Sequence, residues 1–202
     1  MSRLIVCVAL FAFTVALSAQ TPGEREPDSK AQVSSNRLLE MTADRAKALI
    51  RVTDKPHDAD LLTMLGCRAP LPRETPALNP HLDHVVHVYV TSAGERTLRD
   101  GHGEYPVGTV ILKEKLPGAH RDDVKRKAAA KSAPELFTGM LKREKGYHPE
   151  CGDWEFFVVD GAAKQMQARG RIDSCVECHK DYKDTDFVTR TYLRQNKTKA
   201  SK

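Results

Sequence analysis

The spacing of hydrophobic residues changes along this chain of 202 residues, from a helical to an alternating pattern. Between Leu38 and Ile50, apolar residues recur roughly every three to four positions, which predicts a helical region that stops before Pro56. A second short helix is predicted over residues 58–65, and four prolines within residues 68–80 predict an irregular loop. Beyond this loop, runs of β-branched and aromatic residues predict strands.

The second half of the chain is predicted to consist mostly of strands. These are residues 84–90, 108–116, 135–142 and 154–160. Short helices are predicted at residues 95–100 and 122–131, and a C-terminal helix is predicted near residues 172–182. We therefore expect an α+β fold, a mostly β domain with peripheral helices.

The N-terminus has the pattern of a secretory signal peptide. Arg3 precedes fourteen mostly apolar residues, 4–17, and the small residues Ser18 and Ala19 follow. A permanent membrane anchor is the alternative, but the apolar run is shorter than the ~20 residues that a spanning helix needs. We expect residues 1–19 to be removed and the mature protein to be exported, periplasmic or secreted, with no membrane segment.

The rest of the chain is long enough for one domain with a single core. Residues 20–34 are polar and contain two prolines, which predicts a disordered leader before a domain over residues 35–193 and a basic flexible tail over residues 194–202. The formal net charge of +5 is too small to indicate a nucleic-acid partner. The basic residues in 121–131 and in the tail form a solvated surface or, alternatively, a docking patch for an acidic redox partner.

Candidate chemistry is concentrated in one motif near the C-terminus, where Cys175, Cys178 and His179 form a Cys-x-x-Cys-His string. In an exported chain this string is typical of covalent c-type haem attachment, with two thioether bonds from the cysteines and the imidazole as proximal iron ligand. A thiol redox pair or half of a zinc site are the alternatives. A thioredoxin-like redox pair needs a βαβ context and lacks an adjoining histidine, and zinc needs a second ligand pair at similar spacing. The sequence shows neither, so we expect haem c on the C-terminal helix.

Two further cysteines, Cys67 and Cys151, remain after removal of the signal peptide and attachment of haem. In an oxidising compartment an even remainder predicts a disulfide bond between them. Buried free thiols that act as small apolar side chains are the alternative.

Three segments of the chain resemble the cytochrome P-460 family in order and spacing. They are residues 105–115, residues 146–156, and the Cys-x-x-Cys-His motif followed by Asp186-Phe-Val188. The resemblance covers roughly residues 48–193 and implies a periplasmic monohaem cytochrome with an antiparallel sheet, often a homodimer. Members include hydroxylamine oxidisers, and the sheet-type cytochromes c prime that bind nitric oxide are relatives.

The resemblance also implies roles for single residues. In the oxidising members a lysine of the Gly-Thr-Val strand is bonded to the porphyrin, and Lys113 matches it, with Lys115 on the same strand face as a control. Active members carry an acidic residue over the iron, and Thr138 occupies that position here, whereas Glu135 lies on the other face. A threonine hydroxyl hydrogen-bonds a ligand but is a poor base. Met140, on the Thr138 face, is a candidate sixth iron ligand.

These residues leave three expectations for function. The first is an oxidoreductase that acts on hydroxylamine or nitric oxide and passes electrons to a soluble redox partner. The second is a protein that binds or senses nitric oxide without turnover. The third is a simple electron carrier with Met140 or a histidine as sixth ligand. Whether the protein is an enzyme is left open at this point.

Overall fold

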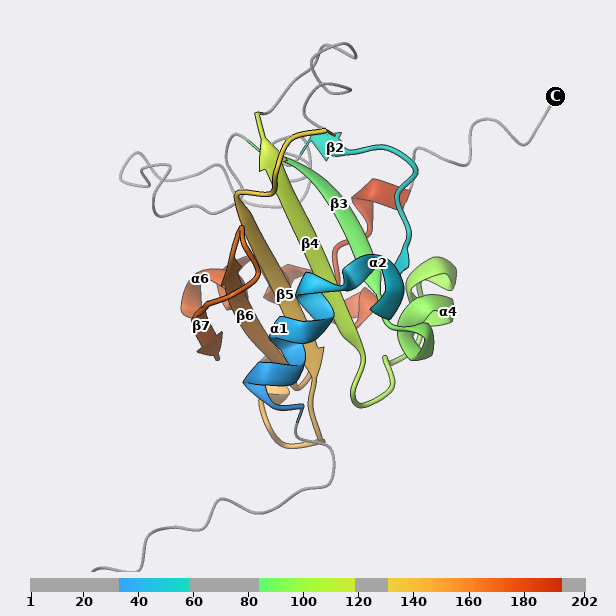
Figure 1. Cartoon of the computed structure of the whole chain (residues 1–202). Helices are drawn as coiled ribbons and strands as arrows, with labels where there is room; N and C mark the ends of the chain where they lie inside the picture. The colour runs from blue at the N-terminus through green and yellow to red at the C-terminus, as the bar shows by residue number, and fades with distance from the viewer. Residues whose placement is uncertain (1–32, 59–83, 119–130, 194–202) are drawn as a thin grey trace, which may run out of the picture.

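An antiparallel β-sheet lies at the centre of the computed structural model, which describes residues 33–58, 84–118 and 131–193 (Figure 1). The described strands follow the order β1-β3-β4-β5-β6-β7, and β2 also pairs with β3. The strands are β1 (Ile50–Arg51), β2 (His57–Asp58), β3 (His84–Val90), β4 (Val110–Pro117), β5 (Leu136–Lys142), β6 (Trp154–Asp160) and β7 (Met166–Gly170). The helices are α1 (Ser35–Ala43), α2 (Arg45–Ala48), α4 (Ser92–Asp100) and α6 (Asp173–His179), with 3₁₀ helices η1 (Pro149–Cys151) and η2 (Lys180–Thr185). The α+β class and the antiparallel sheet are confirmed.

The four strands predicted from the sequence are confirmed as β3, β4, β5 and β6. The helical region predicted up to Ile50 is wrong at its end. The helices stop at Ala48, and Ile50 lies in β1, where it pairs with Val90 of β3. Asp58, the predicted first residue of the second helix, lies in β2. The rest of that helix, the loop over 68–80 and the helix over 122–131 lie outside the described residues, as do residues 1–32 and 194–202.

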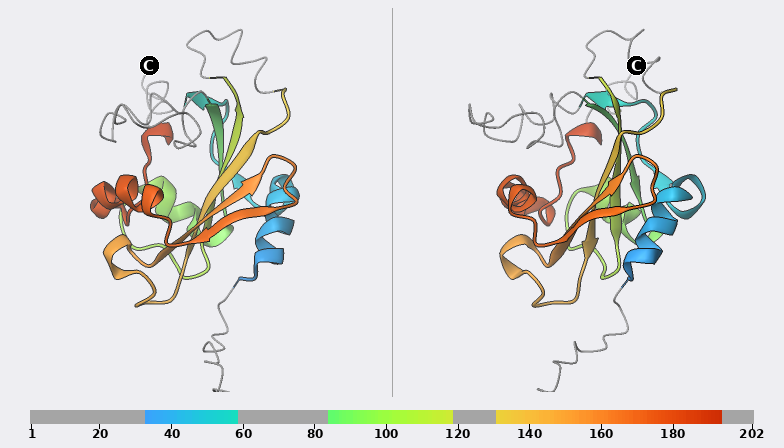
Figure 2. Two further views of the ribbon diagram at one scale, coloured as in Figure 1. Left: turned by 90° about the vertical axis from the view of Figure 1, so that its left-hand side faces the viewer. Right: turned by 60° about the vertical axis from the view of Figure 1, so that its left-hand side comes forward.

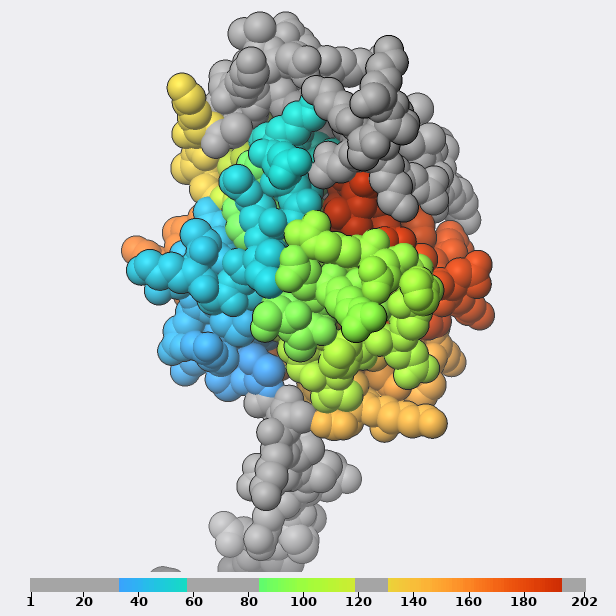
Figure 3. All heavy atoms as spheres, turned by 90° about the vertical axis from the view of Figure 1, so that its right-hand side faces the viewer, coloured from blue at the N-terminus to red at the C-terminus, as the bar shows by residue number. Residues whose placement is uncertain are grey.

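The sheet separates two hydrophobic clusters, because successive side chains of a strand point to opposite faces. On one face, Leu38 of α1 packs in a cluster with Leu112 of β4 and Phe157 of β6. On the other face, Ile111 and Phe156 belong to a cluster against which Cys175 of α6 packs. Figure 2 shows α1 on one side of the sheet and α6 with η2 on the other. Seen from the side of α4, that helix lies between the β1–β2 region and the C-terminal part of the described chain (Figure 3).

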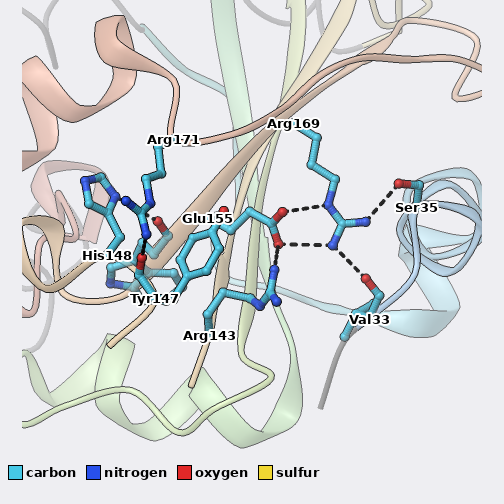
Figure 4. Close-up of polar contacts among 9 residues, drawn as sticks. Val33, Ser35, Arg143, Tyr147, His148, Glu155, Arg169 and Arg171 are labelled. Atoms are coloured by element: carbon cyan, nitrogen blue, oxygen red, sulfur yellow. Dashed lines mark hydrogen bonds and ion pairs between the residues drawn. The ribbon is translucent and has the colours of Figure 1, made fainter. Parts of the chain in front are cut away.

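A buried carboxylate on the α1 side fixes the N-terminal helix to the sheet edge (Figure 4). Glu155 of β6 accepts hydrogen bonds from Arg143 (2.6 Å) and from Arg169 of β7 (2.9 and 3.0 Å). Arg169 also donates to the Ser35 hydroxyl (2.9 Å) and to the Val33 carbonyl (2.7 Å). Burial alone raises the pKa of Glu155, but the bonds from the two arginines outweigh it, so that its pKa lies below the usual value. The cluster thus links β6 and β7 to the start of α1.

Helix α1 begins at Ser35, directly after the stretch over residues 20–34 that the sequence assigns to a leader. Ser34 is the N-cap of α1, and its hydroxyl accepts a hydrogen bond from the Arg37 amide (3.2 Å). Within the parts of the chain that the structure describes, no helix combines the length and the apolar character needed to cross a bilayer.

Candidate functional site

Helix α6 presents the Cys-x-x-Cys-His motif towards the sheet. Cys175, Cys178 and His179 stand at positions i, i+3 and i+4, so one face of the helix carries all three. Asp173 lies in the first turn, where the helix dipole favours a negative charge. Ile172 and Cys175 pack against the cluster on this side of the sheet, which orients the helix. The predicted C-terminal helix is present over Asp173–His179 and continues as η2.

A hollow between α6 and strands β4, β5 and β6 brings most of the predicted site residues together. Its lining residues are Ile111, Lys113, Thr138, Gly139, Met140, Phe156, Cys175 and His179. Lys113 and Thr138 face each other as register partners of β4 and β5. Cys178 lies on the same helix but does not line this hollow. The hollow therefore brings together Lys113, Thr138, Met140, Cys175 and His179, whose roles stay predictions.

The Thr138 hydroxyl is a polar group in the hollow with hydrogen-bonding capacity that no described residue uses. Its hydroxyl oxygen is buried and, among the described residues, has no hydrogen-bond partner. A buried hydroxyl without a partner is costly, so native structures satisfy such groups with protein, water or ligand. Glu135, by contrast, does not line the hollow; its side chain is half exposed and pairs with Nε2 of His84 at 3.0 Å. Thr138 therefore offers a hydroxyl from β5 to a ligand in the hollow.

His179 is prepared to bind a metal ion. Its Nδ1 lies 2.6 Å from the Phe187 carbonyl oxygen, which can only accept, so Nδ1 carries the proton and Nε2 keeps its lone pair. Burial and the nearby Lys113 charge lower the pKa of His179 to about 4, although the Phe187 hydrogen bond acts in the opposite direction. The ring also contacts Phe156, with 5.1 Å between centroids. A neutral imidazole with a fixed tautomer is the form that ligates iron.

Two lysines share the hollow face of β4. Lys113 lines the hollow, and Lys115, two residues further, is fully buried. Burial first, and then repulsion by Lys113, hold the pKa of Lys115 well below its usual value, whereas the nearby Cys175 acts in the opposite direction. The residue considered as a control for Lys113 is thus itself a buried amine close to the motif.

Asp186 and Phe187, two residues that follow α6 and η2, carry roles that the sequence did not reveal. Phe187 supplies the carbonyl that orients His179, and Asp186 next to it forms a buried ion pair with Lys142. In the sequence, the segment Asp186-Phe-Val188 stands out only through the family resemblance. Its position shortly after the Cys-x-x-Cys-His motif is the one feature that points to a role beside His179. Cys151 is fully buried, but Cys67 lies outside the described residues, so their disulfide bond stays a prediction.

The chemical groups of these residues match those that a covalently bound haem needs. One helix offers two thiols and a neutral imidazole, and the opposing strands offer apolar walls and a buried hydroxyl without a partner among the described residues. An antiparallel sheet with these donors on α6 fits a c-type haem cytochrome.

Comparison with known proteins agrees with this class. The family model Cytochrome P460 matches residues 71–190, more than half of the chain. The chain belongs to the cytochrome P460 family, so it is a c-type haem cytochrome and haem is its cofactor. A search of curated proteins found no match.

Proposed function

We propose that this protein is a periplasmic monohaem cytochrome that binds and oxidises small nitrogen species, with hydroxylamine as the first candidate substrate. Cys175 and Cys178 hold the haem, and His179 is the proximal iron ligand. Each thiol adds across a vinyl group, so that a sulfur–carbon bond forms and the thiol hydrogen moves to the other vinyl carbon without net oxidation. The observation that supports this proposal is that His179, Lys113 and Thr138 line the same hollow.

The haem, when bound, supplies an iron site for a small nitrogen ligand and accepts electrons from it. His179 keeps Nε2 available because Nδ1 is engaged with the Phe187 carbonyl. Thr138 offers a hydroxyl to hydrogen-bond the ligand, and Phe156 restricts access of water on the His179 side. Electrons then pass to a soluble redox partner.

Lys113 is the residue that we propose to be bonded to the porphyrin. A nitrogen–carbon bond replaces one hydrogen on the amine and one on a ring carbon, so two electrons must pass to an oxidant. Hydrogen peroxide suffices as this oxidant, since it takes up both hydrogens and is reduced to two water molecules. The position of Lys113 in the hollow supports this bond. It would distort the macrocycle and retune the iron.

Thr138 favours a second function, the binding of nitric oxide without turnover. Oxidation of hydroxylamine requires removal of protons, for which a carboxylate is the natural base. The hollow presents a hydroxyl of Thr138 where active relatives of the family are expected to carry a carboxylate. A third candidate, an electron carrier, rests on Met140, which lines the same hollow and offers a thioether.

Purified, matured protein tests the attachment and the cross-link together. We expect a coloured protein that keeps its haem in acidified acetone, and a haem peptide that contains both the Cys175 segment and the Lys113 strand after proteolysis. Lys113→Arg should keep the haem but restore an ordinary c-type spectrum, whereas the matched variant Lys115→Met should keep the wild-type spectrum. A colourless product contradicts haem attachment, and an unchanged Lys113→Arg spectrum contradicts the cross-link alone.

Anaerobic turnover of hydroxylamine with an artificial electron acceptor separates the candidates. We expect slow turnover in the wild type and faster turnover in Thr138→Glu, because the variant gains a base at the hollow. Tight nitric oxide binding with no turnover in either protein would favour the second function. A sharp low-spin spectrum that becomes high-spin in Met140→Ala would favour the electron carrier.

A further inference from the structure

The Phe187 carbonyl that meets His179 is held in an unusual backbone conformation. Asp186 and Phe187 both have positive φ, 49° and 62°, in the left-handed region that residues with a Cβ rarely adopt. Two such residues in succession persist only when the surroundings determine them closely. The Phe187 amide donates to the Tyr182 carbonyl (2.7 Å), which fixes one side of this turn.

The Asp186 carboxylate is the centre of the contacts that fix the other side. Lys142, at the end of β5, donates to both of its oxygens at 2.8 and 2.6 Å and also to the Gly152 carbonyl at 2.8 Å. The Tyr105 amide donates to the same carboxylate (2.8 Å), and the Trp154 indole donates to the Asp186 carbonyl (2.8 Å). Both side chains of the ion pair are buried, with 8% and 7% of their surface exposed. The three residues that donate to Asp186, namely Tyr105, Lys142 and Trp154, thus come from separate parts of the chain.

The turn packs closely against Gly152, the residue that follows η1. Gly152 has a φ of 61°, and a Cβ added to it would lie 2.5 Å from the Phe187 ring and 2.7 Å from an Asp186 carboxylate oxygen. Such distances are shorter than real Cβ contacts, so only glycine allows this approach. The aromatic pair Tyr105–Trp154, with 5.4 Å between ring centroids, packs beside the ion pair, because the Lys142 ammonium lies 5.3 Å from the centre of the Trp154 ring.

We propose that the Lys142–Asp186 ion pair positions the proximal histidine, because it fixes the Phe187 carbonyl against Nδ1 of His179. The proposal rests on the proposed role of His179 as iron ligand. Neither charged residue lines the hollow, so both act through the carbonyl and are positioning residues. A strong hydrogen bond at Nδ1 makes the imidazole a more basic iron ligand, which strengthens the iron–histidine bond and favours the ferric state.

Resonance Raman spectra of the ferrous holoprotein, together with the reduction potential, test this role. In Lys142→Met we expect the iron–histidine stretching band to move to lower frequency and the reduction potential to rise, because the carbonyl is released. Asp186→Asn keeps the shape of the side chain and should give a smaller shift of the same sign. The double variant removes both charges and should recover stability, since no buried charge is left alone, but it should not recover the band position.

Glu155→Gln is the matched control, because it also breaks a buried ion cluster but on the opposite face of the sheet. It should lower stability and leave the band and the potential in place. A folded Lys142→Met or double variant, with haem attached and both readouts at the wild-type values, overturns the proposed positioning alone. A wild-type iron–histidine band that survives in His179→Ala would instead overturn the assignment of the ligand and, with it, the positioning.

Discussion

Glu155→Gln removes the negative charge that holds two arginines at the edge of the sheet (Figure 4). The Glu155 side chain is 7% exposed, and its partners Arg143 and Arg169 are 13% and 16% exposed. Loss of one partner of a fully buried ion pair costs about 3–5 kcal/mol. Because both arginines keep some contact with solvent, we expect the lower end, about 3 kcal/mol at pH 7.

The pair between His84 and the half-exposed carboxylate of Glu135 provides the comparison. The Glu135 side chain is 54% exposed, so Glu135→Gln should cost less than about 1 kcal/mol. For a domain of this size, the Glu155 variant should also melt roughly 6–12 °C below the wild type. The two variants change the same functional group, so the difference between them measures burial of the ion cluster.

Urea denaturation followed by far-UV circular dichroism at several pH values measures both effects. The folded protein lowers the pKa of Glu155, so the stabilisation is complete above the ordinary glutamate pKa of 4.5 and is lost as the pH falls through the lower, folded value. The gap between wild type and Glu155→Gln should therefore close in acid. Equal losses in the Glu155 and Glu135 variants, or a gap that stays constant down to acid pH, would refute the reasoning.

Two further substitutions test the packing of the two sheet faces. Lys115→Met should raise the urea midpoint at pH 7, and its advantage should shrink as the pH rises towards 10.5, because the wild type folds with a lowered lysine pKa and gains stability over that interval. A pH-independent difference would contradict this. Gly139→Ala should lower stability by about 1–3 kcal/mol, because the new Cβ would lie 2.1 Å from the Phe157 ring. Adding Phe157→Leu should restore part of the loss, and no recovery would show that the ring is not the obstacle.

The sequence predicted strands β3 to β6 because their side chains alternate and are rich in β-branched and aromatic residues. Strand β7 was missed, since Met-Gln-Ala-Arg-Gly lacks that pattern and pairs with β6 as a partly exposed outer strand. The error at Ile50 has a similar origin. Its apolar spacing fits a helix, but pairing with Val90 across the sheet determines its conformation, and a distant partner leaves no local signal.

The residues of the site fall into two groups, those that a local motif identifies and those that depend on contacts with distant parts of the chain. Cys175, Cys178 and His179 are contiguous, so the motif alone identifies them. Lys113 and Thr138 required a resemblance for their roles, and the register between β4 and β5 is what places them opposite each other on one face. The orientation of His179 could not be predicted in this way, because the Phe187 carbonyl depends on backbone dihedrals that no side-chain pattern encodes.

Strand β5 depends on both local alternation and long-range pairing, because its side chains point alternately to the two faces of the sheet and each face has its own partners. Thr138, Met140 and Lys142 follow at intervals of two and so share the face of the sheet that carries the hollow, where they offer a hydroxyl, a thioether and an ammonium group. Arg143, the next residue, turns to Glu155 on the α1 side. A register slip of one residue would exchange the faces and place Lys142 away from Asp186. The buried ion pairs at the end of β5 therefore penalise a wrong register with an unpaired charge, and the same register places Thr138 in the hollow opposite Lys113.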